Sequence, residues 1–196
     1  MVARSKSKEA TDRSVQVLRA AERCIKRHGI RKTTIEDIAV EAGMSRPSVY
    51  RYFADRDALL VALISEHSRA LLQKAHQFIS RQDDLRSQLT AGLIYLAEHG
   101  RRDPFTRYLV GLDGMDLSQT MAMSRASETL TAEFWDPFLD AAEENGTLRP
   151  GIVRADAHLW LGNVGLMLMR MIEEDDRATE RYREMVEAFV VPAFVA

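Results

Sequence analysis

The sequence has few of the residues that mark secreted, disulfide-bonded or membrane proteins. Its 196 residues include a single cysteine, Cys24, which excludes a disulfide within the chain and which we expect to be a small packed side chain. No apolar run approaches the roughly 20 residues that span a bilayer. The segment from Met1 to Lys8 is polar and basic, without the apolar core of a secretory signal. We therefore expect no membrane association and a cytoplasmic location.

Catalytic and metal-binding patterns are absent as well. The five histidines show no metal-ligand spacing with one another or with Cys24. The sequence contains no glycine-rich phosphate loop and no Gly-x-Ser-x-Gly nucleophile motif. It therefore predicts a protein without a metal, a cofactor or enzymatic activity.

The formal net charge is only −2, but charge is unevenly distributed along the chain. Residues 1–56 hold 13 Lys and Arg against 7 Asp and Glu, whereas residues 57–196 hold 14 against 22. A basic N-terminal segment joined to an acidic remainder favours a polyanion as the partner of that segment alone. Chance clustering of solvated charges is the alternative interpretation.

Apolar residues recur at helical spacing almost throughout, and no strand-like alternation is sustained. Glycines such as Gly29 follow apolar stripes where helices end, and Thr34 and Ser45 precede stripes as N-caps. The pattern predicts an all-α protein of about nine helices: one at 12–28, short helices from Thr34 and after Ser45, and further helices at 55–80, 83–99, 104–113, 118–145, 154–173 and 177–194. We expect one domain over residues 1–54 and a larger one over 55–196.

The two short helices have the residue types that a helix-turn-helix requires. Ala39 supplies the small side chain at which the helices can cross closely, and Gly43 suits a turn residue with positive φ. Val49, helped by Phe53, would hold the second short helix against the first. The same spacing occurs in helical corners that do not bind DNA, so that alternative stays open.

The side of the second short helix that lies away from Val49 and Phe53 should face solvent. The residues on that side are Pro47, Ser48, Tyr50 and Arg51. Arg46 lies at the N-terminal end, where recognition helices reach base edges, and arginine can form two hydrogen bonds to guanine. Hydroxyls of Ser48, Tyr50 and Tyr52 can reach phosphate or base, and Thr34 with the amides of its helix can bind phosphate. Further basic residues add sequence-independent attraction: Arg4, Lys6, Lys8, Lys32 and Arg56.

The stretch from Thr33 to Leu63, TTIEDIAVEAGMSRPSVYRYFADRDALLVAL, resembles the DNA-binding signature of the TetR family of transcriptional repressors. The matching features are the threonine before the first short helix, Ile38-Ala39, Ala42-Gly43, Tyr50-x-Tyr52-Phe53 and a charged pair before a Leu-Leu helix. The resemblance covers residues 12–64 well. It is loose beyond them, where residues 146–150 look like a loop that precedes the penultimate helix in many members.

The resemblance implies that residues 1–54 form a helix-turn-helix DNA-binding domain with a basic arm, and that residues 55–196 bind a ligand and dimerise. It implies phosphate contacts from Thr34, Tyr50, Tyr52 and Arg56, and base contacts from Glu36, Arg46, Pro47 and Ser48. A carboxylate at Glu36 could accept only from cytosine and would otherwise repel phosphate. The candidate DNA-binding residues are Thr34, Glu36, Ser45, Arg46, Pro47, Ser48, Tyr50, Arg51, Tyr52 and Arg56.

The resemblance also implies a homodimer formed by the last two helices of each subunit. The sequence is compatible, because residues 160–171 are apolar on more than one side and need cover from their own subunit and from something else. A wholly internal helix is the alternative. The candidate interface residues are Trp160, Val164, Met167, Leu168, Met171, Met185 and Phe189.

Methionine and aromatic residues in the second half of the chain suit the walls of a pocket for a small lipophilic ligand, since Met side chains adapt to irregular shapes. Plain core is the alternative for these residues, and Asn163 could bond within the core, across a dimer or to a ligand. The candidate ligand-binding residues are Tyr95, Phe105, Tyr108, Met115, Met121, Trp135, Phe138 and Asn163.

Together these features predict a sequence-specific transcriptional regulator, a repressor that a lipophilic effector releases from a near-palindromic operator in double-stranded DNA. An all-helical enzyme and a protein-binding adaptor with a hydrophobic cavity are the alternatives. Steeply salt-dependent promoter binding would separate the regulator from the adaptor, because phosphate contacts release counterions.

Overall fold

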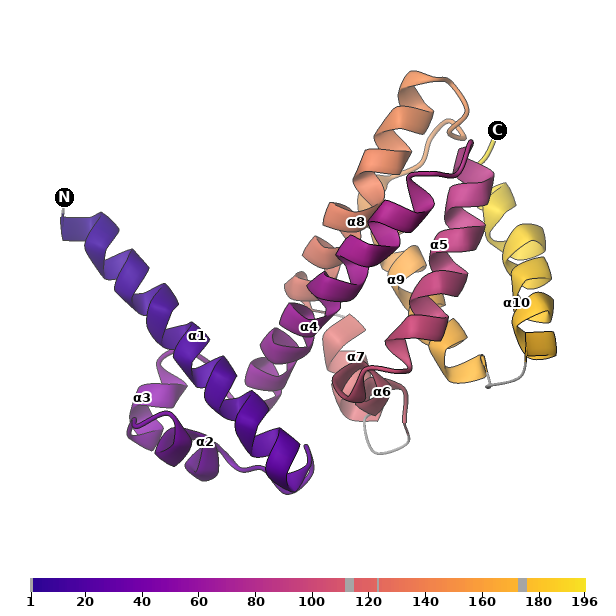
Figure 1. The fold of residues 1–196 in the computed structure, drawn as a ribbon. Helices are drawn as coiled ribbons and strands as arrows, with labels where there is room; N and C mark the ends of the chain where they lie inside the picture. Colours follow the sequence, from indigo (N-terminus) through magenta and orange to yellow (C-terminus); the bar gives the residue numbers. More distant parts are fainter. Residues whose placement is uncertain (1, 112–114, 123, 173–175) are drawn as a thin grey trace. The chain divides into compact units, whose positions relative to one another are not determined.

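The computed structural model describes residues 2–111, 115–122, 124–172 and 176–196, which form α-helices joined by loops (Figure 1). Side chains are described from residue 12 onward, apart from positions 112–115, 118, 122, 123 and 173–178. Contacts divide the chain into two compact units, Met1–Ile64 and Ser65–Ala196. The described residues hold ten α-helices, so the all-α prediction is confirmed and the expected count is one too low.

The N-terminal unit consists of α1 (Val2–His28), α2 (Ile35–Glu41), α3 (Arg46–Tyr50) and the first part of α4 (Arg56–Ile79). Helix α2 packs on both α1 and α3. Val17, Ala20 and Cys24 of α1 are buried, which confirms the expected packing of the cysteine, and Ile38 and Ala39 of α2 are buried too. Helices as short as α2 and α3 are marginal alone, so this packing stabilises them.

A capping box fixes the start of α2. Thr34 Oγ1 accepts from the Asp37 backbone N–H at 3.2 Å, and the Thr34 backbone N–H donates to Asp37 Oδ2 at 2.9 Å. The Thr34 hydroxyl also donates to Asp37 Oδ2, and these hydrogen bonds lower the pKa of the Asp37 carboxyl. The predicted helix start at Thr34 is therefore confirmed.

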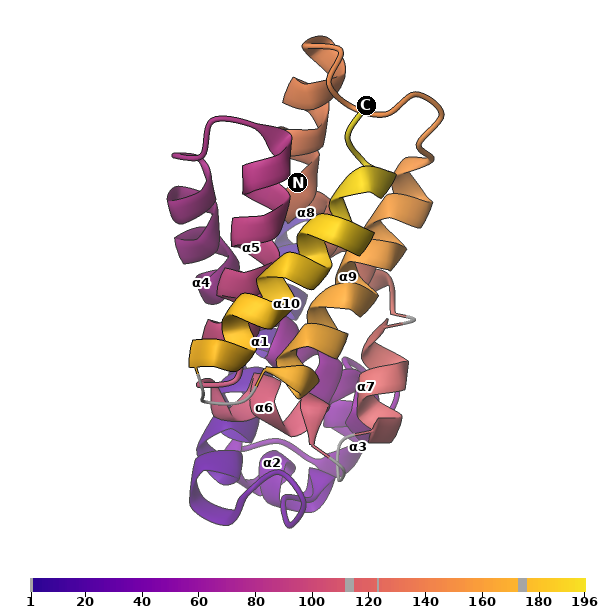
Figure 2. The ribbon, with the colours of Figure 1, turned by 90° about the vertical axis from the view of Figure 1, so that its right-hand side faces the viewer.

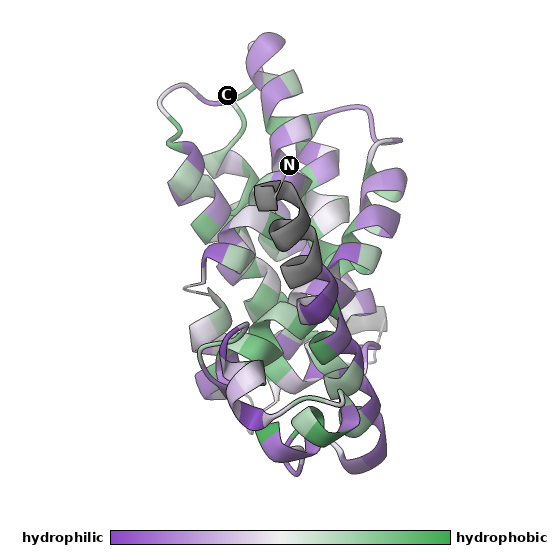
Figure 3. Ribbon diagram, turned by 90° about the vertical axis from the view of Figure 1, so that its left-hand side faces the viewer, coloured by the Kyte–Doolittle hydropathy of each residue, from purple (hydrophilic) through white to green (hydrophobic). Residues whose placement is uncertain are grey.

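In the C-terminal unit, α5 (Leu85–Gly100) packs on α8 (Arg125–Glu144), α9 (Arg154–Met171) and α10 (Asp176–Phe189). Helices α6 (Pro104–Val110) and α7 (Met115–Ala122) contact each other and α9, and a 3₁₀ helix (Val191–Ala193) follows α10. Both views of the ribbon show α5, α9 and α10 side by side (Figures 1 and 2). Hydrophobic and hydrophilic residues alternate along the helices (Figure 3), as amphipathic packing requires.

The core of this unit is built on Leu89 and Leu93 of α5, Trp135 and Leu139 of α8, and Leu161 of α9, all nearly inaccessible to solvent. Among the described residues, no helix combines the length and the apolar character that crossing a membrane would require.

The single helix expected at residues 118–145 is two helices, α7 and α8. Ser124 is the N-cap of α8, and its hydroxyl accepts from the Ser127 backbone N–H at 3.1 Å, which stabilises a new helix start. The last helix ends at Phe189 rather than at 194, because Pro192 lacks the N–H that another α-helical turn would need.

Candidate nucleic-acid interface and ligand cavity

A tight turn joins α2 to α3, as Gly43 predicts. Gly43 has a φ of +64°, and the Met44 backbone N–H donates to the Ala39 carbonyl at 2.9 Å. Val49 is fully buried and holds α3 against the unit, while Phe53 is half-buried. The predicted packing at Ala39, Gly43 and Val49 is therefore confirmed.

The side of α3 opposite Val49 faces solvent, as the helical spacing predicts. Pro47 and Arg51 are exposed, Tyr50 is 39% exposed, and Ser48 is half-buried. A helix with one buried and one exposed polar side has the shape that the major groove of DNA accommodates.

Two neighbours hold the guanidinium of Arg46. It lies 2.5 Å from the Glu36 carboxylate of α2 and 3.3 Å from the Tyr50 hydroxyl, and it sits 5.5 Å from the centre of the Tyr50 ring. The hydrogen bond to Tyr50 and the charge of Glu36 both raise the pKa of Arg46, so the arginine stays charged. The sequence interpretation placed Glu36 on a base and missed this pair. The available signal was the opposite charge of two residues that lie in the first turns of α2 and α3.

Ser45 occupies the N-cap position of α3, but its hydroxyl makes no hydrogen bond to the backbone of that helix. Its Oγ lies instead 2.9 Å from the Oγ of Ser48. The predicted side-chain cap is therefore wrong, because the neighbouring hydroxyl takes the place of the backbone donor. Both serines nevertheless remain at the exposed N-terminal end of α3.

Arg56 anchors the start of α4 to the loop before α2. Its guanidinium donates to the carbonyl oxygens of Ile30, at 2.5 Å, and Thr33, at 3.2 Å. These contacts favour a positioning role, and the phosphate contact that the resemblance implies for Arg56 stays a prediction.

The remaining predicted DNA-binding side chains differ in exposure and in their partners. The Thr34 hydroxyl is bonded to Asp37, and Tyr52 is half-buried with the Arg51 guanidinium 5.8 Å from its ring centre. Lys32 is exposed. The side chains of the basic arm, Arg4, Lys6 and Lys8, lie outside the described residues.

Ion pairs join α1 to α2 behind this surface. Glu41 pairs with Arg23 at 2.6 Å and with Arg27. The hydrogen bonds from Arg27 and then Arg23 lower the pKa of the Glu41 carboxyl. The carboxylate therefore holds together two helices whose positions determine how α3 is presented.

The C-terminal unit contains a cavity of about 110 Å³, walled mainly by leucines from α4, α5, α6, α8 and α9; we call it the apolar cavity. Met121 and Trp135 of the predicted ligand set line it. Its mainly apolar walls fit a small lipophilic ligand.

The other predicted ligand residues lie elsewhere. Phe105 and Phe138 are buried but do not line the apolar cavity, and Tyr95 and Tyr108 are half-buried outside it. Asn163 is exposed, and its Nδ2 donates to the Leu159 carbonyl at 2.7 Å, so it is no core amide. The side chain of Met115 lies outside the described residues.

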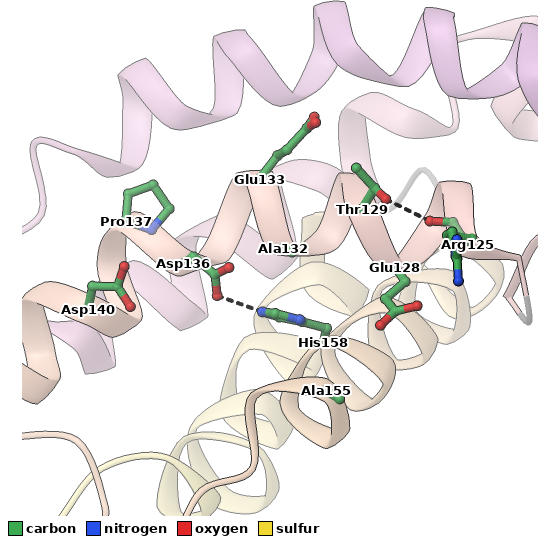
Figure 4. Close-up of a pocket in the computed structure, with 10 residues that line it drawn as sticks. All are labelled: Arg125, Glu128, Thr129, Ala132, Glu133, Asp136, Pro137, Asp140, Ala155 and His158. Carbon is green, nitrogen blue, oxygen red and sulfur yellow. Dashed lines mark hydrogen bonds and ion pairs between the residues drawn. The ribbon is translucent and has the colours of Figure 1, made fainter.

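A second, larger hollow of about 760 Å³ opens on the surface between α8 and α9 (Figure 4). Its lining includes the carboxylates Glu128, Glu133, Asp136 and Asp140, and Asp136 Oδ1 lies 2.6 Å from Nε2 of the buried His158. Because it is open to water and lined by ionisable groups, this acidic hollow does not suit a lipophilic ligand.

The predicted dimer residues fall into two groups. Trp160 and Met167 on α9 and Phe189 on α10 are 51%, 45% and 74% exposed. Val164 and Leu168 are instead buried in the core of their own unit. Met171 and Met185 are half-buried. The structure thus leaves an exposed apolar set on the last two helices.

Comparison with known proteins agrees with the geometry. The profile of the bacterial regulatory proteins of the tetR family matches residues 17–63. An uncharacterised HTH-type transcriptional regulator of Mycobacterium bovis is 26% identical over 152 residues, covering 76% of this chain and 77% of the relative.

Two solved structures share the fold. RolR, in complex with resorcinol, has a TM-score of 0.68 at 16% identity and covers 94% of this chain and 90% of its own. Thermus thermophilus FadR, a TetR family repressor in complex with lauroyl-CoA, has a TM-score of 0.62 at 19% identity and covers 89% and 93%. Residues 17–63 thus carry the DNA-binding domain of the tetR family, and the chain as a whole is similar to HTH-type transcriptional regulators and shares the all-helical fold of these structures.

Proposed function

We propose that this chain is a homodimeric repressor that binds a near-palindromic operator through α3 and is released by a small lipophilic ligand in the apolar cavity. The observation that carries the proposal is the two-sided α3, with Val49 buried and Arg46, Pro47 and Tyr50 exposed. The names of the relatives, all regulators, support a regulatory protein rather than an enzyme.

Arg46 is the residue we propose to read a base, through paired hydrogen bonds to guanine. Glu36 would then act through Arg46, because a carboxylate 2.5 Å away orients the guanidinium before DNA arrives. This role differs from direct recognition of cytosine by Glu36. In a background that already carries Arg46→Ala, Glu36→Gln should leave base preference unchanged if Glu36 only positions Arg46, whereas a direct base reader would still alter it.

Dimerisation is supported by the exposed apolar side chains of α9 and α10. Trp160 and Met167 are seven residues apart on one side of α9, and Phe189 adds a third large exposed side chain. Exposed sets of this kind mark protein interfaces. A symmetric dimer would present two α3 helices to two half-sites, which is why the operator should be a near-palindrome.

Ligand control is supported by α4. Residues Ser68, Leu71 and Leu72 of this helix line the apolar cavity, and its first turn, at Arg56, is bonded to the loop before α2. A ligand that displaces α4 would therefore act on the N-terminal unit through one continuous helix. Binding that favours a state with poorer operator contacts lowers DNA affinity by linkage.

The test is selection of bound DNA from a random pool, followed by affinity measurement at several salt concentrations. We expect an enriched near-palindrome whose affinity falls steeply as salt rises, because phosphate contacts release counterions. Recovery of no common site, or affinity that is insensitive to salt, would contradict the proposal.

A further inference from the structure

We propose that the apolar cavity binds an uncharged molecule of one ring or a short carbon chain that carries a hydroxyl group, and that it excludes carboxylates. The proposal rests on the ligand control proposed above and adds the chemical class of the ligand. Three features carry it: the size of the cavity, the kind of polar group in its walls and a glycine on α9.

The size limits the buried part of the ligand. The cavity measures about 110 Å³, somewhat less than the ~150 Å³ apolar cavity that holds a benzene molecule in another protein. One six-membered ring or a chain of similar volume is therefore the largest group that the cavity accepts without expanding.

Apart from the indole N–H of Trp135, the polar side-chain groups of the walls are hydroxyls. Ser68, Thr106, Ser127 and Thr131 line the cavity, and no Asp, Glu, Lys, Arg or His does. The Thr106 hydroxyl donates to Asp103 Oδ1 at 3.2 Å and the Thr131 hydroxyl donates to the Ser127 carbonyl at 2.8 Å, so each keeps a free acceptor.

The other two hydroxyls are available to a ligand. Among the described residues, neither Ser68 Oγ nor Ser127 Oγ makes a hydrogen bond to another group. The walls therefore offer neutral donors and acceptors to a ligand hydroxyl. A carboxylate would lose its hydration and gain no cation, which makes its burial unfavourable.

Gly165 shows that room is left in the wall. It is buried on α9 and lines the cavity, and a Cβ built there would meet no atom within 4 Å. At Gly92 of α5, by contrast, a Cβ would lie 2.7 Å from Trp135 Cη2, so packing requires that glycine. Glycine destabilises a helix interior relative to alanine. At Gly165 its effect is to leave the cavity open.

The experiment compares three probes that share one ring: benzyl alcohol, toluene and benzoate. Trp135 lines the cavity, whereas Trp160 is exposed, so their two indole N–H resonances report separately in ¹⁵N-labelled full-length protein. We expect benzyl alcohol to shift the Trp135 resonance and to bind at least about tenfold more tightly than benzoate. Equal or tighter binding of benzoate, or no shift of Trp135 with either uncharged probe, would overturn the proposal.

Two variants test the walls. Gly165→Leu should abolish the benzyl alcohol shift, whereas Ala155→Leu, on the exposed side of the same helix, should preserve it. The double variant Ser68→Ala, Ser127→Ala should weaken benzyl alcohol relative to toluene by about threefold or more. An unchanged ratio of the two affinities would contradict the proposed recognition of the ligand hydroxyl. If Gly165→Leu does not fold, the ranking of the three probes on the wild-type protein still tests the proposal.

DNA binding measured on the same preparation separates this inference from the proposed function. Operator binding together with a failed probe ranking would contradict only the ligand class. Absence of specific operator binding would contradict the regulator itself.

Discussion

The candidate sites of the two units differ in where they lie: one is the solvent-exposed side of a single helix, and the other is a cavity between several helices. In the N-terminal unit, burial of Val49 turns Arg46, Pro47 and Tyr50 toward solvent, so the candidate site is an outer surface. In the C-terminal unit, the candidate ligand site is lined by Trp135, Met121 and leucines, and the exposed Trp160, Met167 and Phe189 lie outside it. The residues of a surface site can be predicted from helix periodicity. The residues that line a cavity cannot, because they depend on where large side chains leave a gap between packed helices.

The largest expected effect concerns the exposed apolar set of the C-terminal unit. Trp160→Glu should dissociate the dimer, because an interface tryptophan is worth about 2 kcal/mol or more and each dimer loses two copies. Sedimentation velocity would measure the monomer fraction. Phe78→Glu, which alters another exposed aromatic residue on α4, is the matched control. A variant Trp160→Glu that sediments as the wild type would place the interface elsewhere.

The next effect concerns the exposed side of α3. Arg46→Ala should weaken operator binding by about 1–3 kcal/mol and relax preference at one base pair of each half-site. Competition binding with singly substituted operators measures both quantities. Lys32→Ala, which removes an exposed charge, should instead weaken all sequences alike. If Arg46→Ala leaves base preference unaltered, another residue must recognise the base and the proposed role of Arg46 is wrong.

A smaller effect concerns the turn that presents α3. Gly43 has a φ of +64° and open space around a built Cβ, so Gly43→Ala adds backbone strain without a clash. It should destabilise the N-terminal unit by about 1 kcal/mol. Chemical denaturation measures the change, and Gly111→Ala, where φ is −75°, controls for the added methyl. Equal effects of the two variants would show that the turn conformation is not what matters.

The smallest effect is a pH dependence of the contact between α1 and α2. Hydrogen bonds from Arg27 and Arg23 lower the pKa of Glu41 below its ordinary value of 4.5. Its stabilising contribution is therefore complete above about pH 4.5 and is lost as the pH falls through the lower folded-state pKa. Amide hydrogen exchange of α1 and α2 should accelerate over that range in the wild type. Glu41→Gln should lack this component, and an identical pH profile in the variant would contradict the assignment.

Sequence patterns predicted the N-terminal unit in detail because packing leaves few choices there. The positive φ at Gly43, the burial of Val49 and the N-cap at Thr34 each follow from one local requirement. The pair of Glu36 with Arg46 escaped prediction, since it depends on how two helices are oriented rather than on spacing within one. Ser45 does occupy the N-cap position, but its hydroxyl pairs with Ser48 rather than with the backbone, and spacing alone does not decide between these two local partners.

The C-terminal unit was predicted only at the level of its helices. Aromatic and methionine residues share hydrophobicity whether they line a cavity or fill a core, so Phe105 and Phe138 could not be separated from Trp135 in advance. The prediction from helix periodicity also treated α7 and α8 as one helix, because it did not recognise Ser124 as the N-cap of a new helix. The open space beside Gly165 cannot be inferred from the sequence, because it depends on which side chains of other helices lie near that glycine.

Cross-linking from α3 to DNA tests most directly that the exposed side of this helix meets the duplex. A photoreactive group attached at Ser48→Cys should cross-link to selected operator DNA, because position 48 lies on that side, while the native Cys24 is buried. The same group at Val153→Cys, exposed in the C-terminal unit, should give no cross-link. Equal cross-linking from both positions, or none from position 48 under conditions where the operator is bound, would contradict the account.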